Sequence, residues 1–439
     1  MPARQLQQAL GVSQPTMWRL AQRAGARIVR IGRARTTRYA VRRNIGTLGS
    51  TWPLYSIDAD GRSHVAAQLH ALAPRSWWYA AVDPAPAWLH RDFTDGLFPD
   101  LPWFLDDMRP QGFMGRAFAR RHGEALGLDR DPQLWSADGG LSALLRYGDD
   151  TPGNFIVGDS ALEHFERTKL VPPETIALEH RVGRYANLAE AALADDVPGS
   201  SAGGEQPKFT ACVDEGGEYR QLLVKFSPRR DTPGGRRWAD LLVCEHLASN
   251  AMRENGLDAC ETRLSEDGGR CFLEVVRFDR VGRYGRRGFV SLMALSNAYH
   301  GQLDNWVAAA DRLQRDGWLN HEDADTLRVL WWFGGLIRNT DMHFGNVSLA
   351  LDFGRPLRLA PAYDMLPMHY RPTAAGEVVT REFVPPLPPP PQRSLWLRAA
   401  NIAVTFWERA LADSRISDEF RAEAARVLDA TSLLRERYA

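Results

Sequence analysis

The sequence predicts an α+β protein in which a two-lobed body follows a small helix-turn-helix domain at the N-terminus. Three observations predict this arrangement. Residues 1–45 contain ten Arg and no Asp or Glu, in the order helix, turn, helix, hairpin. Short, apolar, strand-like segments then dominate residues 151–285, and helix-like segments dominate residues 286–439. A sheet-rich half followed by a helix-rich half indicates two lobes with a cleft between them.

The basic N-terminal domain, residues 1–46, is predicted to be a winged helix-turn-helix that binds DNA. Apolar spacing predicts helices over 4–11 and 13–24, and an Arg-rich hairpin over 26–43 would form the wing. The second helix would enter the major groove, and its expected contacts are Gln14, Thr16, Trp18 and Arg19. The wing would bring Arg33, Arg35 and Arg38 to phosphates or to the minor groove. A basic cap that packs on the body, or an RNA-binding arm, is the alternative.

The body is predicted to have three parts. Residues 47–150 form a mixed α and β subdomain with no catalytic constellation, and residues 151–285 form a β-rich N-lobe. The expected strands of the N-lobe are FIVG, KFTACV, YRQLLVKFS and CFLEVVRF, with a helix over 239–256 before the last of them. Residues 286–439 form a helical C-lobe, in which VPPLPPPP at 384–391 predicts a stiff surface strap.

Composition sets the broad class of the protein. Hydrophobic residues make up 44% and charged residues 25%, as in an ordinary globular protein, which excludes a disordered or collagen-like chain. The four Cys form no CxxC pair, and no apolar run approaches the roughly 20 residues that a membrane span needs. We therefore expect a cytoplasmic protein with no membrane partner.

Lysine is rare in this chain, which singles out two of its three lysines. Lys208 follows the glycine-rich segment GSSAGGEQP, and Lys225 lies within the apolar strand LLVKFSP. Glycine allows backbone N–H groups to approach a phosphate, and a strand lysine pairs nucleotide phosphates in kinases. The expected nucleotide contacts of the loop are Ser201, Ala202, Gly203 and Gly204. Taken alone, a simple hairpin turn explains the glycine-rich segment better than a phosphate loop does, and an exposed strand lysine explains Lys225 as well as a ligand contact does. The scarcity of lysine favours a function for Lys225.

The segment RNTDMHFGN, residues 338–346, carries the strongest chemical signal. Asp341 and Asn346 have the D-x-x-x-x-N spacing of a kinase catalytic loop, in which Asp accepts the substrate proton and Asn holds a metal ion. Asp364 would complete the metal site after a hairpin. His343 is a candidate to support this loop and to contact the nucleotide, and a structural histidine with satisfied hydrogen bonds is the alternative. A metal hydrolase could also use these side chains, but it would leave Lys225 and the glycine loop without a role. The order of the four motifs therefore favours kinase-type phosphoryl transfer.

These motifs resemble those of the HipA family, the serine/threonine kinase toxins of bacterial toxin–antitoxin systems. The resemblance rests on SSAGGEQPKF, LLVKFSP, VVRFDR, NTDMHFGN and AYDML, and it spans about residues 90–420. With its helix-turn-helix, the chain is similar to the YjjJ-like branch of that family. The resemblance implies a two-lobed protein-kinase-like (HipA-like) fold that uses ATP and Mg²⁺.

The resemblance also implies roles for particular residues. Asp341 would accept the proton, Asn346 and Asp364 would hold the metal, and the adenine would lie on the hinge from Val276 to Phe278. Ser200, or else Ser201, would be autophosphorylated, which places about −2 charge where the phosphates of ATP would bind.

Two departures from the family pattern bear on the site. Val276 replaces an acidic hinge residue, and Asp240-Leu241 occupies the place where the family has Asn-Glu. The acid that orients Lys225 is therefore either Asp240 or Glu245.

The function predicted from all of these features is an ATP-dependent serine/threonine protein kinase with a fused DNA-binding head. The alternatives are a DNA-binding regulator whose kinase-like module only senses nucleotide, and a small-molecule kinase. The expected partners are DNA, a protein substrate, an antitoxin and a second copy of the chain, and the sequence identifies none of them further.

Overall fold

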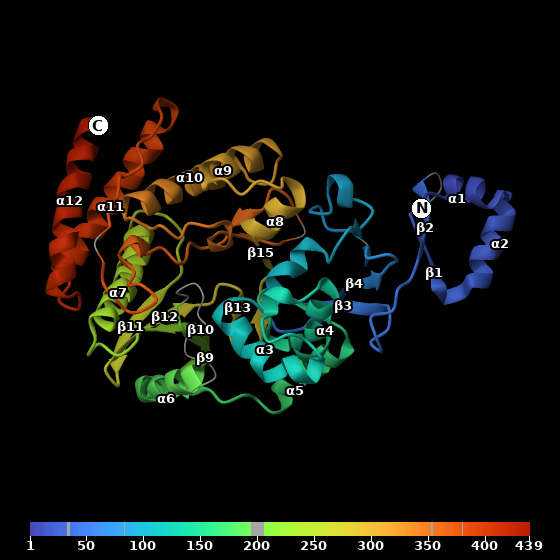
Figure 1. The fold of residues 1–439 in the computed structure, drawn as a ribbon, viewed down its shortest axis with the longest axis horizontal. Helices are drawn as coiled ribbons and strands as arrows, with labels where there is room; N and C mark the ends of the chain where they lie inside the picture. The colour runs from blue at the N-terminus through green and yellow to red at the C-terminus, as the bar shows by residue number, and fades with distance from the viewer. Residues whose placement is uncertain (33–35, 83, 195–205, 353, 380) are drawn as a thin grey trace.

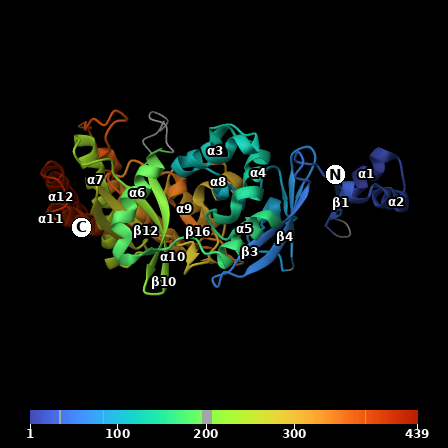
Figure 2. The same ribbon diagram turned by 90° about the horizontal axis from the view of Figure 1, so that it is seen from below.

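The computed structural model describes residues 1–32, 36–82, 84–194, 206–352, 354–379 and 381–439. The molecule is elongated, with the N-terminal head at one end and the last two helices at the other (Figure 1). The sheet-containing subdomains lie between these ends (Figure 2). None of the described helices combines the length and the apolar character needed to span a membrane.

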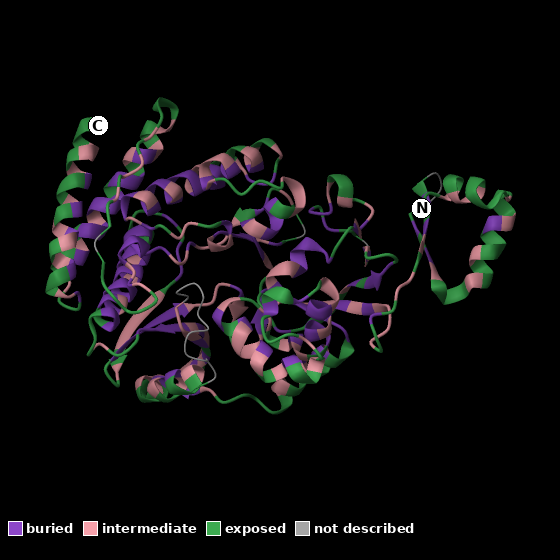
Figure 3. Ribbon diagram, viewed as in Figure 1, coloured by how far each residue is buried: buried purple, intermediate pink, exposed green. Residues whose placement is uncertain are grey.

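The head consists of two helices and a hairpin, as the sequence predicts. Its elements are α1 (Ala3–Leu10), α2 (Gln14–Ala24), β1 (Ile28–Ile31) and β2 (Arg38–Val41). Helix α1 buries no residue and α2 buries only Met17, so the head has little core of its own, in contrast to the body (Figure 3). The hairpin instead packs Val29 and Ile31 against Leu72 of the next subdomain. The wing is therefore anchored to the body rather than free.

The middle subdomain is a five-stranded antiparallel sheet with helices. Its elements are β3 (Thr51–Ile57), β4 (Ser63–Ala71), β5 (Trp77–Ala81), β6 (Leu97–Phe98), α3 (Gly112–Leu126), α4 (Ala137–Tyr147), β7 (Phe155–Val157) and α5 (Asp159–Leu170). The strand order is β6-β5-β4-β3-β7. The expected boundary at 150 is wrong, because β7 pairs with β3 through Leu54 and Val157 and not with the N-lobe. A short apolar strand does not specify its sheet, so only the pairing could decide this point.

The N-lobe is a second five-stranded sheet between two helices. Its elements are β8 (Ile176–Ala177), α6 (Arg181–Ala194), β9 (Lys208–Glu215), β10 (Glu218–Phe226), α7 (Pro233–Glu254), β11 (Thr262–Asp267) and β12 (Arg270–Val276), followed by the hairpin β13 (Arg280–Val281) and β14 (Gly285–Arg286). The strand order is β11-β12-β10-β9-β8. Val224 and Phe226 of β10 belong to the same apolar cluster as Tyr185 and Ala189 of α6. Because side chains alternate along a strand, Lys225 points to the opposite face, toward α7.

The C-lobe is mainly helical. Its elements are β15 (Phe289–Ser291), α8 (Leu292–Tyr299), α9 (Trp306–Arg315), α10 (His321–Leu336), β16 (Ser348–Ala350), β17 (Arg358–Leu359), α11 (Arg393–Ala412) and α12 (Asp418–Tyr438). Its core continues into the middle subdomain, where Trp103 packs edge-on against Tyr299 and Trp318. The middle subdomain and the C-lobe therefore share one apolar core.

Candidate active site

A buried lysine lies at the centre of the candidate site. The side chain of Lys225, on β10, is only 4% exposed, and its Nζ lies 2.6 Å from Oε1 of Glu245 on α7. The same Nζ contacts Oδ1 of Asp364. Burial alone lowers the pKa of Lys225, but the two carboxylates outweigh it and raise the pKa above its ordinary value. The lysine is therefore a permanent cation held between two acids from different lobes.

The structure decides which acid orients Lys225. Glu245 contacts it, whereas Asp240 accepts hydrogen bonds from the backbone N–H and the hydroxyl of Ser417, at 2.8 and 2.7 Å. Asp240 and Glu245 are five residues apart on α7, so they lie on different faces of a helix with 3.6 residues per turn. A strand lysine paired with a helix glutamate is the arrangement that protein kinases use to hold nucleotide phosphates.

Asp364 sits in a strained backbone conformation. Its φ is +56°, in the left-handed region that non-glycine residues rarely adopt. Its backbone carbonyl accepts a hydrogen bond from Nδ2 of Asn339 at 3.2 Å. Burial opposes ionisation of the carboxyl group, but Lys225 and then Lys208 outweigh burial and lower the pKa of Asp364. Asp364 is therefore ionised at neutral pH, as a metal ligand must be.

The loop of Asp341 is held by its own side chains. Asn339 Oδ1 accepts a hydrogen bond from the backbone N–H of Asp341 at 3.0 Å, and Asn346 Nδ2 donates to the Asp341 carbonyl at 2.8 Å. His343 is exposed, and its Nδ1 accepts a hydrogen bond from the Gly345 N–H at 3.0 Å. These bonds fix the loop before any ligand arrives. They also give His343 a capping role in the turn.

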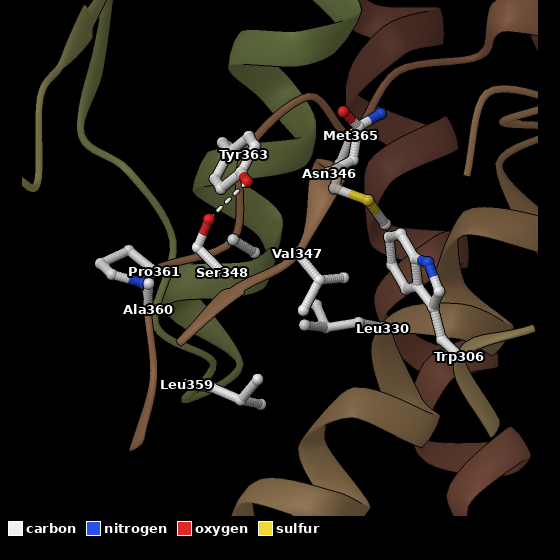
Figure 4. Close-up of a pocket in the computed structure, with 11 residues that line it drawn as sticks. Trp306, Leu330, Asn346, Val347, Ser348, Leu359, Ala360, Pro361, Tyr363 and Met365 are labelled. Carbon is white, nitrogen blue, oxygen red and sulfur yellow. Dashed lines mark hydrogen bonds between the residues drawn. The ribbon is translucent and has the colours of Figure 1, made fainter. Parts of the chain in front are cut away.

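Tyr363 joins the Asp364 segment to the Asn346 turn. Its hydroxyl lies 2.9 Å from the Gly345 carbonyl, to which it donates, and 2.7 Å from the hydroxyl of Ser348. Figure 4 shows this bond beside Asn346, at a cavity of about 10 Å³, which is room for about one water molecule. The hydrogen bond from Tyr363 to Gly345 therefore joins the residue before Asp364 to the residue before Asn346, and these are the two residues predicted to hold the metal.

The donor set fits Mg²⁺ bound together with a nucleotide. Among the described residues, no three His, Cys, Asp or Glu side chains gather to form an all-protein metal cage. Mg²⁺ does not require one, because it is usually bound by one or two protein ligands together with water and substrate phosphates. Asn346 and Asp364 would supply those ligands.

The structure places the remaining predicted nucleotide contacts as follows. Val276 ends β12 and pairs with Leu222 in the N-lobe sheet, and the ring of Phe278 stacks on Tyr363 with centroids 5.8 Å apart. Lys208 begins β9 and pairs in register with Lys225. The predicted loop residues Ser200, Ser201, Ala202, Gly203 and Gly204 lie outside the described residues.

Sequence reasoning did not single out Asn339 and Tyr363. A signal was present for Asn339, because an Asn two residues before another residue can accept that residue's N–H in an Asx turn. For Tyr363 there was none, since its partners lie on a separate turn and on strand β16.

The predicted DNA contacts on the recognition helix are accessible. Gln14, Trp18 and Arg19 are exposed on α2, and Thr16 is half-buried. On the wing, Arg38 lies 3.5 Å from Asp95 of the body, so part of its charge is already compensated. Arg33 and Arg35 lie outside the described residues.

Comparison with known proteins now identifies the family. Residues 48–166 match the model of the YjjJ-like toxin middle domain, and residues 200–431 match the HipA-like C-terminal domain. Toxin YjjJ of Escherichia coli K12 is 36% identical over 421 residues, which cover 95% of this chain and 92% of that protein. The chain belongs to the HipA-like toxin family, in its YjjJ-like branch. The HipA family predicted from the motifs is thus confirmed.

A solved structure confirms the HipA-like fold. The chain matches one from the complex of Shewanella oneidensis HipA, HipB and operator DNA with a TM-score of 0.53 and 15% identity, over 88% of this chain and 97% of that one. The end of the middle-domain match at 166 also agrees with the sheet pairing, which places β7 in the middle subdomain.

Proposed function

We propose that the chain is an ATP-dependent serine/threonine protein kinase of toxin type with a fused DNA-binding head. One observation carries the kinase proposal. The buried cation of Lys225 is paired with Glu245 and Asp364, next to a loop in which hydrogen bonds hold Asp341 and Asn346. Phosphoryl transfer depends mainly on positioning and on neutralisation of charge, and this site is organised for both.

Each residue has a defined task in the proposed reaction. Lys225, and with it Lys208, would neutralise the phosphates of ATP, while Asn346 and Asp364 would hold Mg²⁺, which neutralises the charge that develops on the transferred group. Asp341 would accept the proton of a serine or threonine hydroxyl while the oxygen of that hydroxyl bonds to the γ-phosphorus. The bond from that phosphorus to the oxygen bridging the β- and γ-phosphates breaks, and ADP leaves with that electron pair.

The first experiment is phosphoryl transfer with purified protein, Mg²⁺ and labelled ATP, beside Asp341→Asn. Asp352→Asn, which changes an exposed carboxylate beyond β16, is the matched control. We expect label on the wild type and the control only, and mass spectrometry should place it on Ser200 or Ser201. ATP binding without transfer in the wild type would contradict the kinase and favour a regulator that senses nucleotide.

We propose that the head binds DNA through α2, because its side chains are exposed at the end of the molecule farthest from the C-terminal helices (Figure 1). The HipA complex with HipB and operator DNA supports a DNA partner and an antitoxin partner for this chain as well. Arg19→Ala should weaken DNA binding and reduce the slope of log affinity against log salt by about 1, and Arg130→Ala on the body should not. Unchanged binding and slope in Arg19→Ala would contradict this docking mode.

A further inference from the structure

A strained arginine lies next to the loop of Asp341. Arg338 lies two residues after the end of α10 at Leu336 and precedes Asn339, and its φ is +61°. Glycine adopts this conformation without steric cost, whereas any L-residue with a side chain is strained there. The Arg338 carbonyl accepts a hydrogen bond from the backbone N–H of His369 at 3.0 Å. The strained residue is therefore bonded to the chain that follows Asp364.

The side chain of Arg338 also contacts the chain after Asp364, at Tyr370 and Phe383, and this stretch is called the clasped segment below. Its Nη1 donates to the hydroxyl of Tyr370 at 2.6 Å. Its guanidinium lies 5.6 Å from the ring centre of Tyr370 and 5.2 Å from that of Phe383. Both distances are within the range of cation–π attraction. Arg338 thus contacts two aromatic rings that lie thirteen residues apart in the sequence.

The clasped segment closes on itself and reaches the helix of Glu245. Arg381 Nη1 donates to the carbonyls of His369 and Arg371, at 2.8 and 2.9 Å, so the two limbs of the segment are joined. The buried ring of Tyr370 lies 6.0 Å from the guanidinium of Arg237, on the first turns of α7. A chain of contacts therefore links Arg338 to the helix that carries the partner of Lys225.

We propose that Arg338 is a positioning residue for the proposed phosphoryl transfer. Its side chain holds the segment that follows Asp364, and its backbone position next to Asn339 couples that segment to Asp341, because Asn339 bonds to both Asp341 and Asp364. The inference rests on the proposed kinase function. It gives a reason for an arginine in a conformation that favours glycine, because a planar cation donates to the Tyr370 hydroxyl and also lies over the rings of Tyr370 and Phe383.

The test compares Arg338→Gly with Arg91→Gly. Glycine keeps the backbone conformation and removes only the side chain. Arg91 is the matched control, since its φ is +51° and it pairs with Asp316 at 3.0 Å, at a junction between the middle subdomain and the C-lobe. Arg338→Lys, which keeps the charge but loses the planar fork, gives the same comparison should the glycine variant not fold.

The first readout is amide hydrogen exchange over residues 365–379, in the protein alone. We expect faster exchange in Arg338→Gly, a smaller increase in Arg338→Lys, and no change in Arg91→Gly. The second readout is catalysis: kcat should fall on the order of 10- to 100-fold in Arg338→Gly, while nucleotide affinity changes by less than about threefold.

Unchanged exchange in Arg338→Gly would show that Arg338 does not hold the segment. Faster exchange together with a wild-type kcat would show that holding the segment does not position the reacting groups. A wild type that transfers no phosphate would contradict the proposed kinase instead, and the exchange result would still decide whether Arg338 holds the segment. The two failures are therefore distinguishable.

Discussion

At the scale of single residues, the site depends on one buried cation and two carboxylates. Lys225 and Glu245 are both 4% exposed, so removing either charge leaves the other buried and poorly compensated. Asp364 shares the same lysine from the other lobe. The three charges act as one unit, and a change to one of them alters the others.

The first prediction concerns Glu245→Gln. The loss of this carboxylate frees Lys225 to pair with Asp364 alone, so phosphoryl transfer should fall on the order of 10²-fold because the lysine is misplaced. Glu254→Gln at the exposed end of the same helix is the control and should leave the rate unchanged. The measurement is steady-state transfer of labelled phosphate. Equal rates in the two variants would show that Glu245 does not orient Lys225 for the reaction.

The second prediction uses a buried carboxyl group outside the site. Burial raises the pKa of Asp107 from 3.8 to about 6, although its Oδ2 accepts a hydrogen bond from the Ser291 N–H at 2.6 Å. Between these two values the unfolded chain releases the proton and the folded chain keeps it. The free energy of unfolding should therefore fall as the pH rises from about 4 to about 6, by up to about 3 kcal/mol from this group.

Asp107→Asn tests this prediction, because the amide keeps an acceptor oxygen and cannot ionise. The difference in free energy of unfolding, variant minus wild type, should be more positive at pH 8 than at pH 4.5, as measured by urea unfolding of both proteins at both pH values. Asp106→Asn changes the neighbouring carboxylate, which is 45% exposed, and should show no such difference. The same stability difference at both pH values in Asp107→Asn would contradict the shifted pKa.

At the scale of elements, α7 is positioned by a bond to α12. Ser417 caps α12, since its hydroxyl accepts the Phe420 N–H at 3.3 Å, and the same hydroxyl donates to the buried carboxylate of Asp240 at 2.7 Å. One residue thus ends a loop, begins a helix and holds the helix that carries Glu245. Arg237, one turn before Asp240 on α7, also contacts α12, since its guanidinium lies 5.0 Å from the ring centre of Phe420.

The third prediction is that Ser417→Ala lowers the free energy of unfolding by about 1–2 kcal/mol, because it removes a helix cap and a bond to a buried carboxylate. Ser394→Ala, at an exposed position in the first turn of α11, should change stability by less than about 0.5 kcal/mol. Urea unfolding measures both. Equal stability of the two variants would show that Asp240 does not depend on Ser417.

At the scale of the whole molecule, the head is a thin unit held by its hairpin. Val29 is 6% exposed and faces Leu72, which is fully buried, whereas Val41 on the paired strand is 48% exposed. The backbone continues the attachment, since the Ala73 N–H donates to the Val41 carbonyl at 2.8 Å. The orientation of the proposed DNA-binding surface therefore depends on a small apolar contact and on backbone hydrogen bonds.

The fourth prediction is that Val29→Asp releases the head from the body. A charge buried against Leu72 is not compensated, so trypsin should cut the Arg-rich head much faster while the thermal transition of the body stays unchanged. Val41→Asp is the matched control in the same hairpin and should be cut at the wild-type rate. Equal cutting of both variants would show that the contact does not hold the head.

The sequence by itself determined the residue types and order of the site, from Lys225 to Asp364, and the helix–helix–hairpin order of the head. These features are local, because periodicity, turn residues and short spacings act within a few residues of one another. The family followed from the same local motifs.

Only the tertiary structure decided which distant groups meet. It selected Glu245 over Asp240, placed β7 in the middle sheet, paired Arg38 with Asp95, and brought Lys225 to an aspartate 139 residues away. The physical reason is that such contacts depend on how whole faces of sheets and helices pack. A local pattern states that a face is apolar or charged, but not which other face will cover it.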